Sequence, residues 1–138
     1  MLVTKIAVFL ENRAGRLAEL TKVLSDNNIN LMSLSITDGE SFGIMRAVTD
    51  NNELALKVLK ESGFNTSATE LLAFEIDNKA GALAKVLKVL TDASVNVGYL
   101  QSYSSTDAKT AVVMIKASDN ESATKALTTA KVKLVSKL

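Results

Sequence analysis

One short sequence occurs twice in this chain, first as Leu10-Glu-Asn-Arg-Ala-Gly-Arg-Leu17 and then, 66 positions later, as Ile76-Asp-Asn-Lys-Ala-Gly-Ala-Leu83. The match continues without a gap to Asn30 and Asn96, and it resumes after a two-residue slip. Agreement over this length indicates an internal repeat rather than chance. The 138 residues therefore predict two domains, residues 1–68 and residues 69–138.

Each half has the hydrophobic periodicity of a strand, a helix, two strands, a helix and a final strand. Residues 3–10 are a nearly continuous apolar run, which is typical of a buried strand. From Asn30 the apolar residues alternate, and residues 42–49 predict the returning strand of a hairpin with its turn at Asp38-Gly39. We expect the first helix to place four apolar side chains on one face: Leu17, Leu20, Val23 and Leu24.

The second helix has recognisable ends. Asn51 or Asn52 is a suitable N-cap, and Gly63 followed by Phe64 has the pattern of a C-terminal stop with a hydrophobic contact. Residues 65–69 then supply the last strand of the first half, and the next strand follows without a linker. The elements predicted in the second half are 71–76, 81–93, 96–103, 109–117, 119–130 and 131–138.

This element order predicts an α+β protein. A domain of this small size buries less of its surface than a pair does, so we expect the two βαββαβ units to lie side by side. The expected sheet is antiparallel, with the helices packed on one face.

The composition excludes several classes of function. Sixteen Lys and Arg against fifteen Asp and Glu leave a net charge of +1, so no global field attracts nucleic acid or an anionic membrane. The chain has no His and no Cys, which removes the usual general base, the thiol nucleophile and the thiolate ligand of zinc. No phosphate-binding or dinucleotide-binding glycine motif occurs. We therefore expect no enzymatic activity, no metal and no cofactor.

The sequence also favours a cytoplasmic protein. Its N-terminal apolar run ends at Glu11 and is too short for the core of a signal peptide. No segment has the roughly 20 apolar residues that span a bilayer.

The repeated loop suggests a binding chemistry. The first turn of a helix has backbone N–H groups without intrahelical partners, and a small carboxylate can dock on them where Gly15 or Gly81 adds no side chain. The amide oxygen of Asn12 or Asn78 can accept a hydrogen bond from an ammonium group. Together these groups meet the needs of a free α-amino acid. The alternative is that the Asn caps the helix and the Gly relieves crowding against the sheet.

Two further repeated pairs each allow two interpretations. Asn30 and Asn96 either close the turn from helix to strand, since Asn tolerates left-handed backbone, or bind a ligand at the strand ends. Arg13 and Lys79 occupy equivalent loop positions, where they are either partners of a ligand carboxylate or ordinary exposed cations.

Two βαββαβ units with an Asn-x-x-Gly-x-Leu loop and an Asn-Ile/Val-type entry to the second strand resemble ACT domains. The resemblance extends over nearly the whole chain and is closest to stand-alone tandem ACT proteins. It implies a ferredoxin-like fold, association between ACT domains, and amino-acid sites at interfaces beside the loop. Many ACT loops have Pro before the Gly, whereas this chain has Ala14 and Ala80. Carried over by position, the ligand-binding residues are Asn12, Arg13, Ala14, Gly15, Asn30 and Leu31 in one unit, and Asn78, Lys79, Ala80, Gly81, Asn96 and Val97 in the other.

The leading hypothesis is a non-enzymatic regulatory protein that senses a free amino acid as a homodimer and signals to a separate regulated enzyme. The alternative is a scaffold or assembly module without a ligand, in which the loops only cap their helices.

Overall fold

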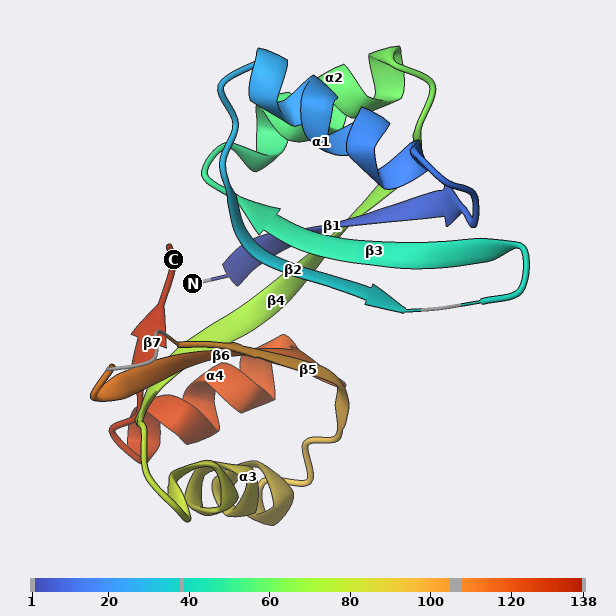
Figure 1. Cartoon of the computed structure of the whole chain (residues 1–138). Coiled ribbons are helices and arrows are strands. Elements are labelled where there is room, and N and C mark those ends of the chain that lie inside the picture. Colours follow the sequence, from blue (N-terminus) through green and yellow to red (C-terminus); the bar gives the residue numbers. More distant parts are fainter. Residues whose placement is uncertain (1, 38, 105–107, 138) are drawn as a thin grey trace. The chain divides into compact units, whose positions relative to one another are not determined.

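A computed structural model describes residues 2–37, 39–104 and 108–137 (Figure 1). The chain forms two compact units, each considered by itself below. The N-terminal unit is Thr4–Thr69, and the C-terminal unit consists of the described residues of 70–138 together with those of 1–3. No helix in the described part of the chain has the length and hydrophobicity to cross a bilayer.

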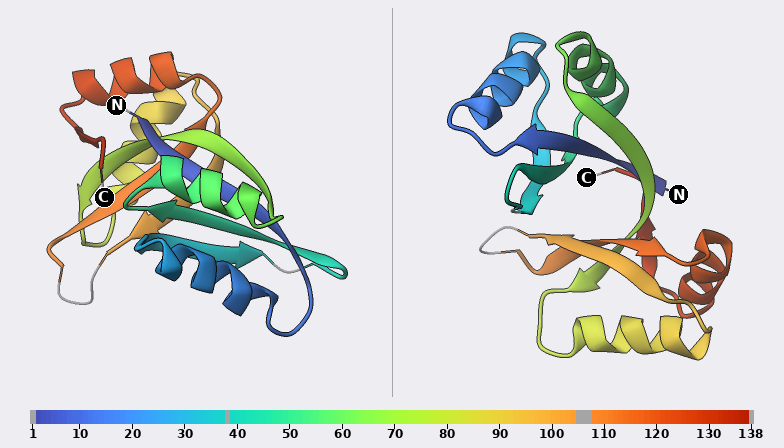
Figure 2. Two further views of the ribbon diagram at one scale, coloured as in Figure 1. Left: turned by 90° about the horizontal axis from the view of Figure 1, so that it is seen from above. Right: turned by 90° about the vertical axis from the view of Figure 1, so that its right-hand side faces the viewer.

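The N-terminal unit is a four-stranded antiparallel sheet with two helices on one face (Figures 1 and 2). The strands lie in the order β4-β1-β3-β2, and Val8 pairs with Met45 while Leu34 pairs with Ala47. Its elements are β1 (Leu2–Glu11) from Thr4 onward, α1 (Arg16–Asp26), β2 (Leu31–Thr37), β3 (Phe42–Thr49), α2 (Asn52–Glu61) and the first part of β4 (Asn65–Asp77).

The core of this unit forms because strand and helix periodicities meet on one side of the sheet. Ile6, Val8 and Leu10 of β1 alternate along the strand and pack under Leu20 and Leu24 of α1. Burial of Leu20 and Leu24 confirms the predicted apolar face of the first helix, with Val23 partly buried against the same cluster. Leu17 departs from the prediction, since it remains 38% exposed at the start of the helix.

The C-terminal unit repeats this architecture with the order β7-β4-β6-β5. Phe74 of β4 pairs with Val113 on one side and with Leu134 on the other, and its fully buried ring lies in the core. The elements are the second part of β4, α3 (Ala82–Asp92), β5 (Val97–Tyr103), β6 (Thr110–Ala117), α4 (Asn120–Thr129) and β7 (Lys133–Val135). The α+β class and the βαββαβ order of both units are therefore confirmed.

The ends of α2 agree with the sequence. Asn51 is the N-cap, and its Oδ1 accepts a hydrogen bond of 3.2 Å from the N–H of Leu54. Gly63 has φ 86°, and the next N–H, that of Phe64, returns to the carbonyl of Leu59 at 3.0 Å. The Phe64 ring is buried in the core, so the predicted glycine stop and its hydrophobic contact are confirmed.

The structure differs from the sequence prediction at two strands. The strands expected at 65–69 and 71–76 are one continuous strand, β4, and the predicted domain boundary falls within it. The last strand, expected over 131–138, is limited to Lys133–Val135. Lys131 has φ 61° and lies in the left-handed turn after α4, so the chain cannot extend before that turn is complete. The predicted turn residue Asp38 lies outside the described residues.

Candidate functional site

The candidate loop of the N-terminal unit connects β1 to α1. Gly15 is the N-cap of α1 with φ 87°, and no side chain caps the helix. Asn12 therefore does not cap the helix, contrary to one interpretation of the sequence. Crowding is not the reason for the glycine either, because a Cβ on Gly15 would meet nothing within 4 Å. The glycine is required by the left-handed backbone.

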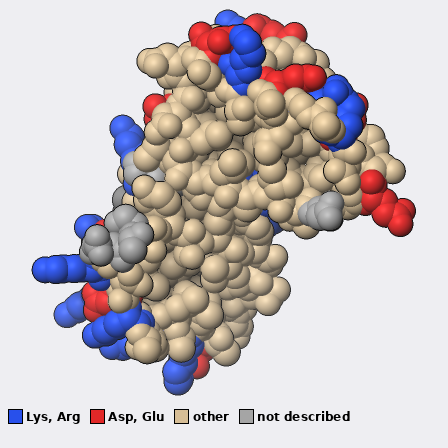
Figure 3. Space-filling model, in the orientation of Figure 1, with Lys and Arg blue, Asp and Glu red and all other residues tan. Residues whose placement is uncertain are grey.

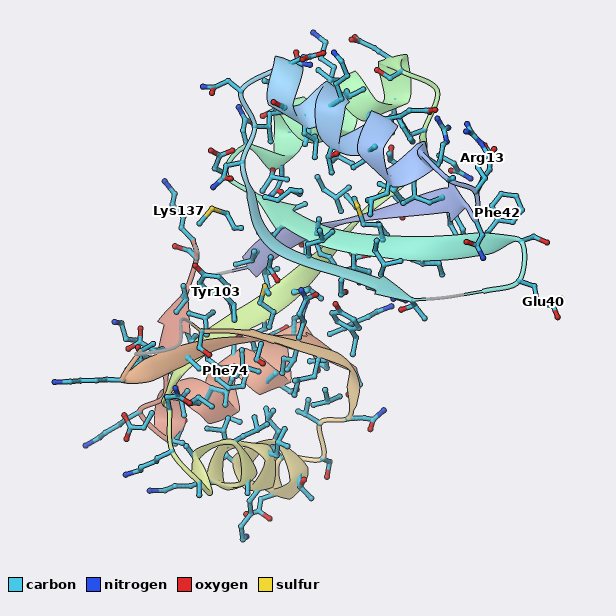
Figure 4. All side chains as sticks on the ribbon, in the orientation of Figure 1. Arg13, Glu40, Phe42, Phe74, Tyr103 and Lys137 are labelled. Atoms are coloured by element: carbon cyan, nitrogen blue, oxygen red, sulfur yellow. The ribbon has the colours of Figure 1, made fainter. Side chains whose placement is uncertain are left out.

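The Asn side chain has a different role that the sequence did not suggest. Its Nδ2 donates to the carbonyl of Gly39 at 3.1 Å, and the Asn12 backbone N–H donates to the carbonyl of Ser41 at 2.9 Å. These bonds fasten the loop to the turn between β2 and β3, 27 residues away. Figure 4 shows Arg13, Glu40 and Phe42 at this end of the unit.

The loop of the C-terminal unit has the same geometry. Gly81 is the N-cap of α3 with φ 86° and also lacks a side-chain cap. Asn78 donates from Nδ2 to the carbonyl of Ala108 at 3.0 Å and from its backbone N–H to the carbonyl of Lys109 at 2.8 Å. Both repeats therefore use the Asn amide nitrogen within the chain, which directs the amide oxygen elsewhere.

The first turn of each helix presents backbone donors. In α1 the first helical bond is donated by Glu19 to the carbonyl of Gly15 at 2.9 Å. Within the described residues, the N–H groups of Leu17 and Ala18 have no acceptor, and the same holds for Leu83 and Ala84 of α3. These N–H groups carry the positive end of the helix dipole.

A surface pocket of about 280 Å³ adjoins the N-terminal loop. It is lined by Leu10, Glu11, Asn12, Arg13, Leu17, Ile36 and Gly43. Leu17 and Ile36 leave apolar surface exposed there, at 38% and 47% of their areas. The pocket thus combines an apolar wall with the loop that presents the backbone donors.

The two loop cations are engaged within the chain. Nε of Arg13 lies 3.1 Å from Oε2 of Glu11, and its Nη1 lies 3.5 Å from Oε1 of Glu19. The hydrogen bond to Glu11 raises the pKa of the Arg13 guanidinium. The hydrogen bond from Arg16 lowers the pKa of Glu19. In the other unit, Lys79 lies 3.5 Å from Asp77. These contacts favour the interpretation of Arg13 and Lys79 as ordinary exposed cations, each paired with a carboxylate of its own unit.

Asn30 and Leu31 lie at the opposite end of α1 from Asn12. The helix has eleven residues and is about 16 Å long, so one unit cannot bring the two groups to a single small ligand. Asn30 donates its backbone N–H to Oδ1 of Asp50 at 2.9 Å and accepts from the N–H of Asp50 at 3.1 Å. It lines a separate pocket of about 390 Å³ with Leu31 and Asp50.

Asn96 and Val97 take the same place after α3. The backbone N–H of Asn96 donates to Oγ of Ser118 at 2.9 Å, and the N–H of Ser118 returns to the Asn96 carbonyl at 2.8 Å. The left-handed residues of these turns are Asn28 and Ser94. The proposal that Asn30 and Asn96 close the turn through left-handed backbone is therefore wrong.

Ala14 and Ala80 are exposed in the two loops.

No group of three or more His, Cys, Asp or Glu side chains converges in the described part of the chain.

Comparison with known proteins identifies the architecture. Residues 1–137 match the family described as an ACT domain pair. The crystal structure of protein BT0572 from Bacteroides thetaiotaomicron is 36% identical, with a TM-score of 0.92 over 98% of this chain and 92% of that one. No curated protein matches the chain significantly in sequence.

More distant structures share the fold. The ligand-free regulatory subunit of aspartate kinase from Thermus thermophilus is 17% identical, with a TM-score of 0.65 over 94% of this chain and 93% of that one. The corresponding subunit from Thermus flavus is 16% identical, with a TM-score of 0.61 over 95% and 94%.

Proposed function

We propose a function from one premise: the chain belongs to the ACT domain pair family. The protein is a non-catalytic regulatory protein that binds a free amino acid at its β1–α1 and β4–α3 loops. The bound amino acid changes the association of the protein with itself or with a separate regulated enzyme. Such a ligand acts only through its different affinities for the two states, typically about 1–3 kcal/mol.

The observation that supports a ligand is the identical construction of the two loops. Each has a left-handed glycine at the N-cap, two backbone N–H groups without an acceptor among the described residues, and an Asn fixed through its Nδ2. The N–H groups suit a carboxylate, and the Asn oxygen suits an ammonium group. A free α-amino acid carries both a carboxylate and an ammonium group, so it can use the N–H donors and the Asn oxygen together.

We propose that the complete site lies between two protomers of a homodimer. The loop and the Asn30 region of one unit are separated by the length of α1, so a ligand that touches both kinds of residue needs a second unit, and here a second protomer supplies it. The exposed apolar side chains beside the N-terminal loop support an interface at that surface. They are Leu17, Ile36 and Phe42, exposed by 38%, 47% and 56%. Light scattering coupled to gel filtration measures the oligomeric state.

A thermal-shift screen of the twenty amino acids tests the ligand. An amino acid present at 100 times its dissociation constant stabilises the folded state by about 2.7 kcal/mol, which raises the melting temperature by several degrees. We expect a response to one amino acid or to a few that share a side-chain class. Equal melting temperatures with all twenty would refute the proposal.

Loop variants then locate the binding. Asn12→Ala together with Asn78→Ala removes both amide oxygens and should abolish the response. The matched control is Asn27→Ala, because the Nδ2 of Asn27 also donates to a backbone carbonyl, that of Val23 at 2.8 Å, but lies at the far end of α1. A response that survives in the double variant places the ligand elsewhere.

The second candidate function is a ligand-free assembly module, and the Asn bonds to the hairpin favour it. In that case Asn12 and Asn78 serve only to hold the loops against the turns after β2 and β5. The double variant should then lower stability by about 1 kcal/mol for each lost bond, while the chain shows no response to any amino acid.

A further inference from the structure

One corner of the N-terminal unit is filled by a stacked pair of side chains. The guanidinium of Arg16 lies over the ring of Phe64, 4.1 Å from its centroid. Nη1 of Arg16 lies 2.8 Å from Glu19, and its Nε lies 3.7 Å from Glu11. The side chain of Arg16 is only 17% exposed, so the space between α1 and the chain after α2 is occupied by the protein itself.

The same corner of the C-terminal unit is open. The repeat places Ala82 where the first unit has Arg16, and Val132 where it has Phe64. Both replacements remove bulk, and a pocket of about 410 Å³ takes the place of the stacked pair. We call it the α3–β7 pocket; it is lined by Glu75, Ile76, Asp77, Lys79, Ala82, Lys85, Val86, Val89, Ala130, Lys131, Val132 and Lys133. Its volume is in the range of small-molecule sites.

One charge at this corner is reversed, and one position gains a positive charge. Lys85 stands where the first unit has Glu19, and Lys131 stands where it has Gly63. The other two lysines of the rim are paired, Lys79 with Asp77 at 3.5 Å and Lys133 with Glu75 at 3.3 Å. Lys85 and Lys131 have no carboxylate within 4.0 Å among the described residues. The α3–β7 pocket therefore carries an excess of positive charge.

The surrounding surface reinforces this field. Residues 70–138 contain nine Lys against seven Asp and Glu, whereas residues 1–69 contain seven Lys and Arg against eight Asp and Glu. In Figure 3, cationic side chains gather over the part of the C-terminal unit at the lower left. An anion is therefore attracted to this unit more than to its repeat.

The floor of the pocket is apolar. Ile76, Val86, Val89 and Val132 supply aliphatic surface, and Val86 is only 7% exposed. An inorganic anion gains nothing from such a floor, whereas a ring or branched chain gains roughly 25 cal/mol for each Å² of apolar surface that it removes from water.

From the void, the reversed charge and the apolar floor, we infer that the α3–β7 pocket binds an organic acid with an apolar body. Its ring or branched chain takes the space that Phe64 fills in the first unit, and its carboxylate lies near Lys85 and Lys131. The α3–β7 pocket adjoins the β4–α3 loop of the proposed function and shares Lys79 with it, but neither Asn78 nor Gly81 lines the pocket. The inference does not rest on the proposed function.

Nuclear magnetic resonance of the ¹⁵N-labelled full chain tests the inference with 3-phenylpropionate as the probe. We expect saturable shifts concentrated on the amides of Ala82, Val86, Lys131 and Val132. The neutral analogue 3-phenylpropan-1-ol should bind about tenfold more weakly because it lacks the charge, and inorganic phosphate should not saturate the same amides.

Variants of one helix provide the matched comparison. Lys85→Glu should weaken 3-phenylpropionate about tenfold, whereas Lys88→Glu should not, since Lys88 is 75% exposed, pairs with Asp92 at 2.8 Å and lies outside the pocket. Ala82→Arg, which restores the residue of the first unit, should abolish the shifts.

The inference fails if no saturable shift occurs at any soluble concentration, if the alcohol or phosphate binds as well as the acid, or if the two lysine variants weaken binding equally. Lys85→Glu separates the two proposals, because Lys85 is not part of the loop site: the variant should weaken the binding of 3-phenylpropionate and leave any amino-acid response unchanged.

Discussion

The two repeats have nearly the same loop between the first strand and the first helix, but they differ in the corner beside that loop. The loops agree in the φ of their glycines, 87° and 86°, and in the Asn hydrogen bonds to the neighbouring turn. The adjoining corner holds Arg16 and Phe64 in one unit and the α3–β7 pocket in the other. The duplicated scaffold thus repeats the geometry of the loop, while the corner beside it holds packed side chains in one unit and a pocket in the other.

The difference also shows how a pocket arises without new backbone. The helices α1 and α3 have equal lengths of eleven residues, and the pocket follows from two smaller side chains and one reversed charge. Phe64 stabilises the first unit by burial, whereas the smaller Val132 buries less apolar surface in the second.

The largest expected effect comes from truncating the residues at the corner, Phe64 and Val132. Phe64→Ala should cost about 3–5 kcal/mol, because it removes a ring that is 5% exposed and leaves a cavity. Val132→Ala should cost only about 1 kcal/mol, because the residue is partly exposed beside an existing pocket. Amide hydrogen exchange in each core measures the two units separately. Equal losses would show that the corners are equivalent in energy.

Substitution of Gly15 and Gly81 tests the loop geometry that the two repeats share. Gly15→Ala and Gly81→Ala should each cost about 1–2 kcal/mol through backbone strain alone, since neither Cβ meets a neighbour. Hydrogen exchange of α1 and α3 should report the same loss in both variants. A much larger loss for one of them would mean that the loops differ in a way that their equal φ angles do not reveal.

Much of the fold could be predicted from the sequence because its signals are local. The order of elements, the α2 cap and the Gly63 stop depend on residues within a few positions of one another, and the repeat is read directly by comparing the chain with itself. The role of Asn12 could not be predicted, because its partner is a turn 27 residues away. The pocket was also missed, although the Arg16 to Ala82 difference is visible in the repeat. Its meaning depends on contact between α1 and the chain that follows α2.

The Asn bonds give the third test, with a smaller effect. Asn12→Ala and Asn78→Ala should each cost about 1 kcal/mol, since each removes the exposed hydrogen bonding of one amide nitrogen to the backbone of the neighbouring turn. Urea unfolding followed by circular dichroism measures the loss. Asn27→Ala serves as the reference for an exposed amide bond elsewhere, and losses well above it would indicate that the loops organise more than the neighbouring turn.

The smallest expected effect is a pH dependence that differs between the N-caps of α2 and α4, the second helices of the two units. The cap of α4 is Asp119, whose hydrogen bond from the Ser122 hydroxyl lowers the pKa of its carboxyl, whereas the cap of α2 is the uncharged Asn51. A lowered folded pKa means that the carboxylate stabilises the unit above the ordinary Asp value of about 3.9 and loses this contribution as the pH falls through the folded pKa. Asp119→Asn keeps a capping side chain but removes the titration. The free energy of unfolding of the wild type relative to that of Asp119→Asn, measured with urea, should therefore be constant near neutral pH. Below about pH 4 the wild type should lose stability relative to the variant. The reciprocal change Asn51→Asp should introduce a weaker acid sensitivity into the N-terminal unit, because Leu54 offers a backbone N–H but no hydroxyl where the C-terminal unit has Ser122. A pH-independent difference at position 119 would show that the cap is held by hydrogen-bond geometry alone, without a contribution from its charge.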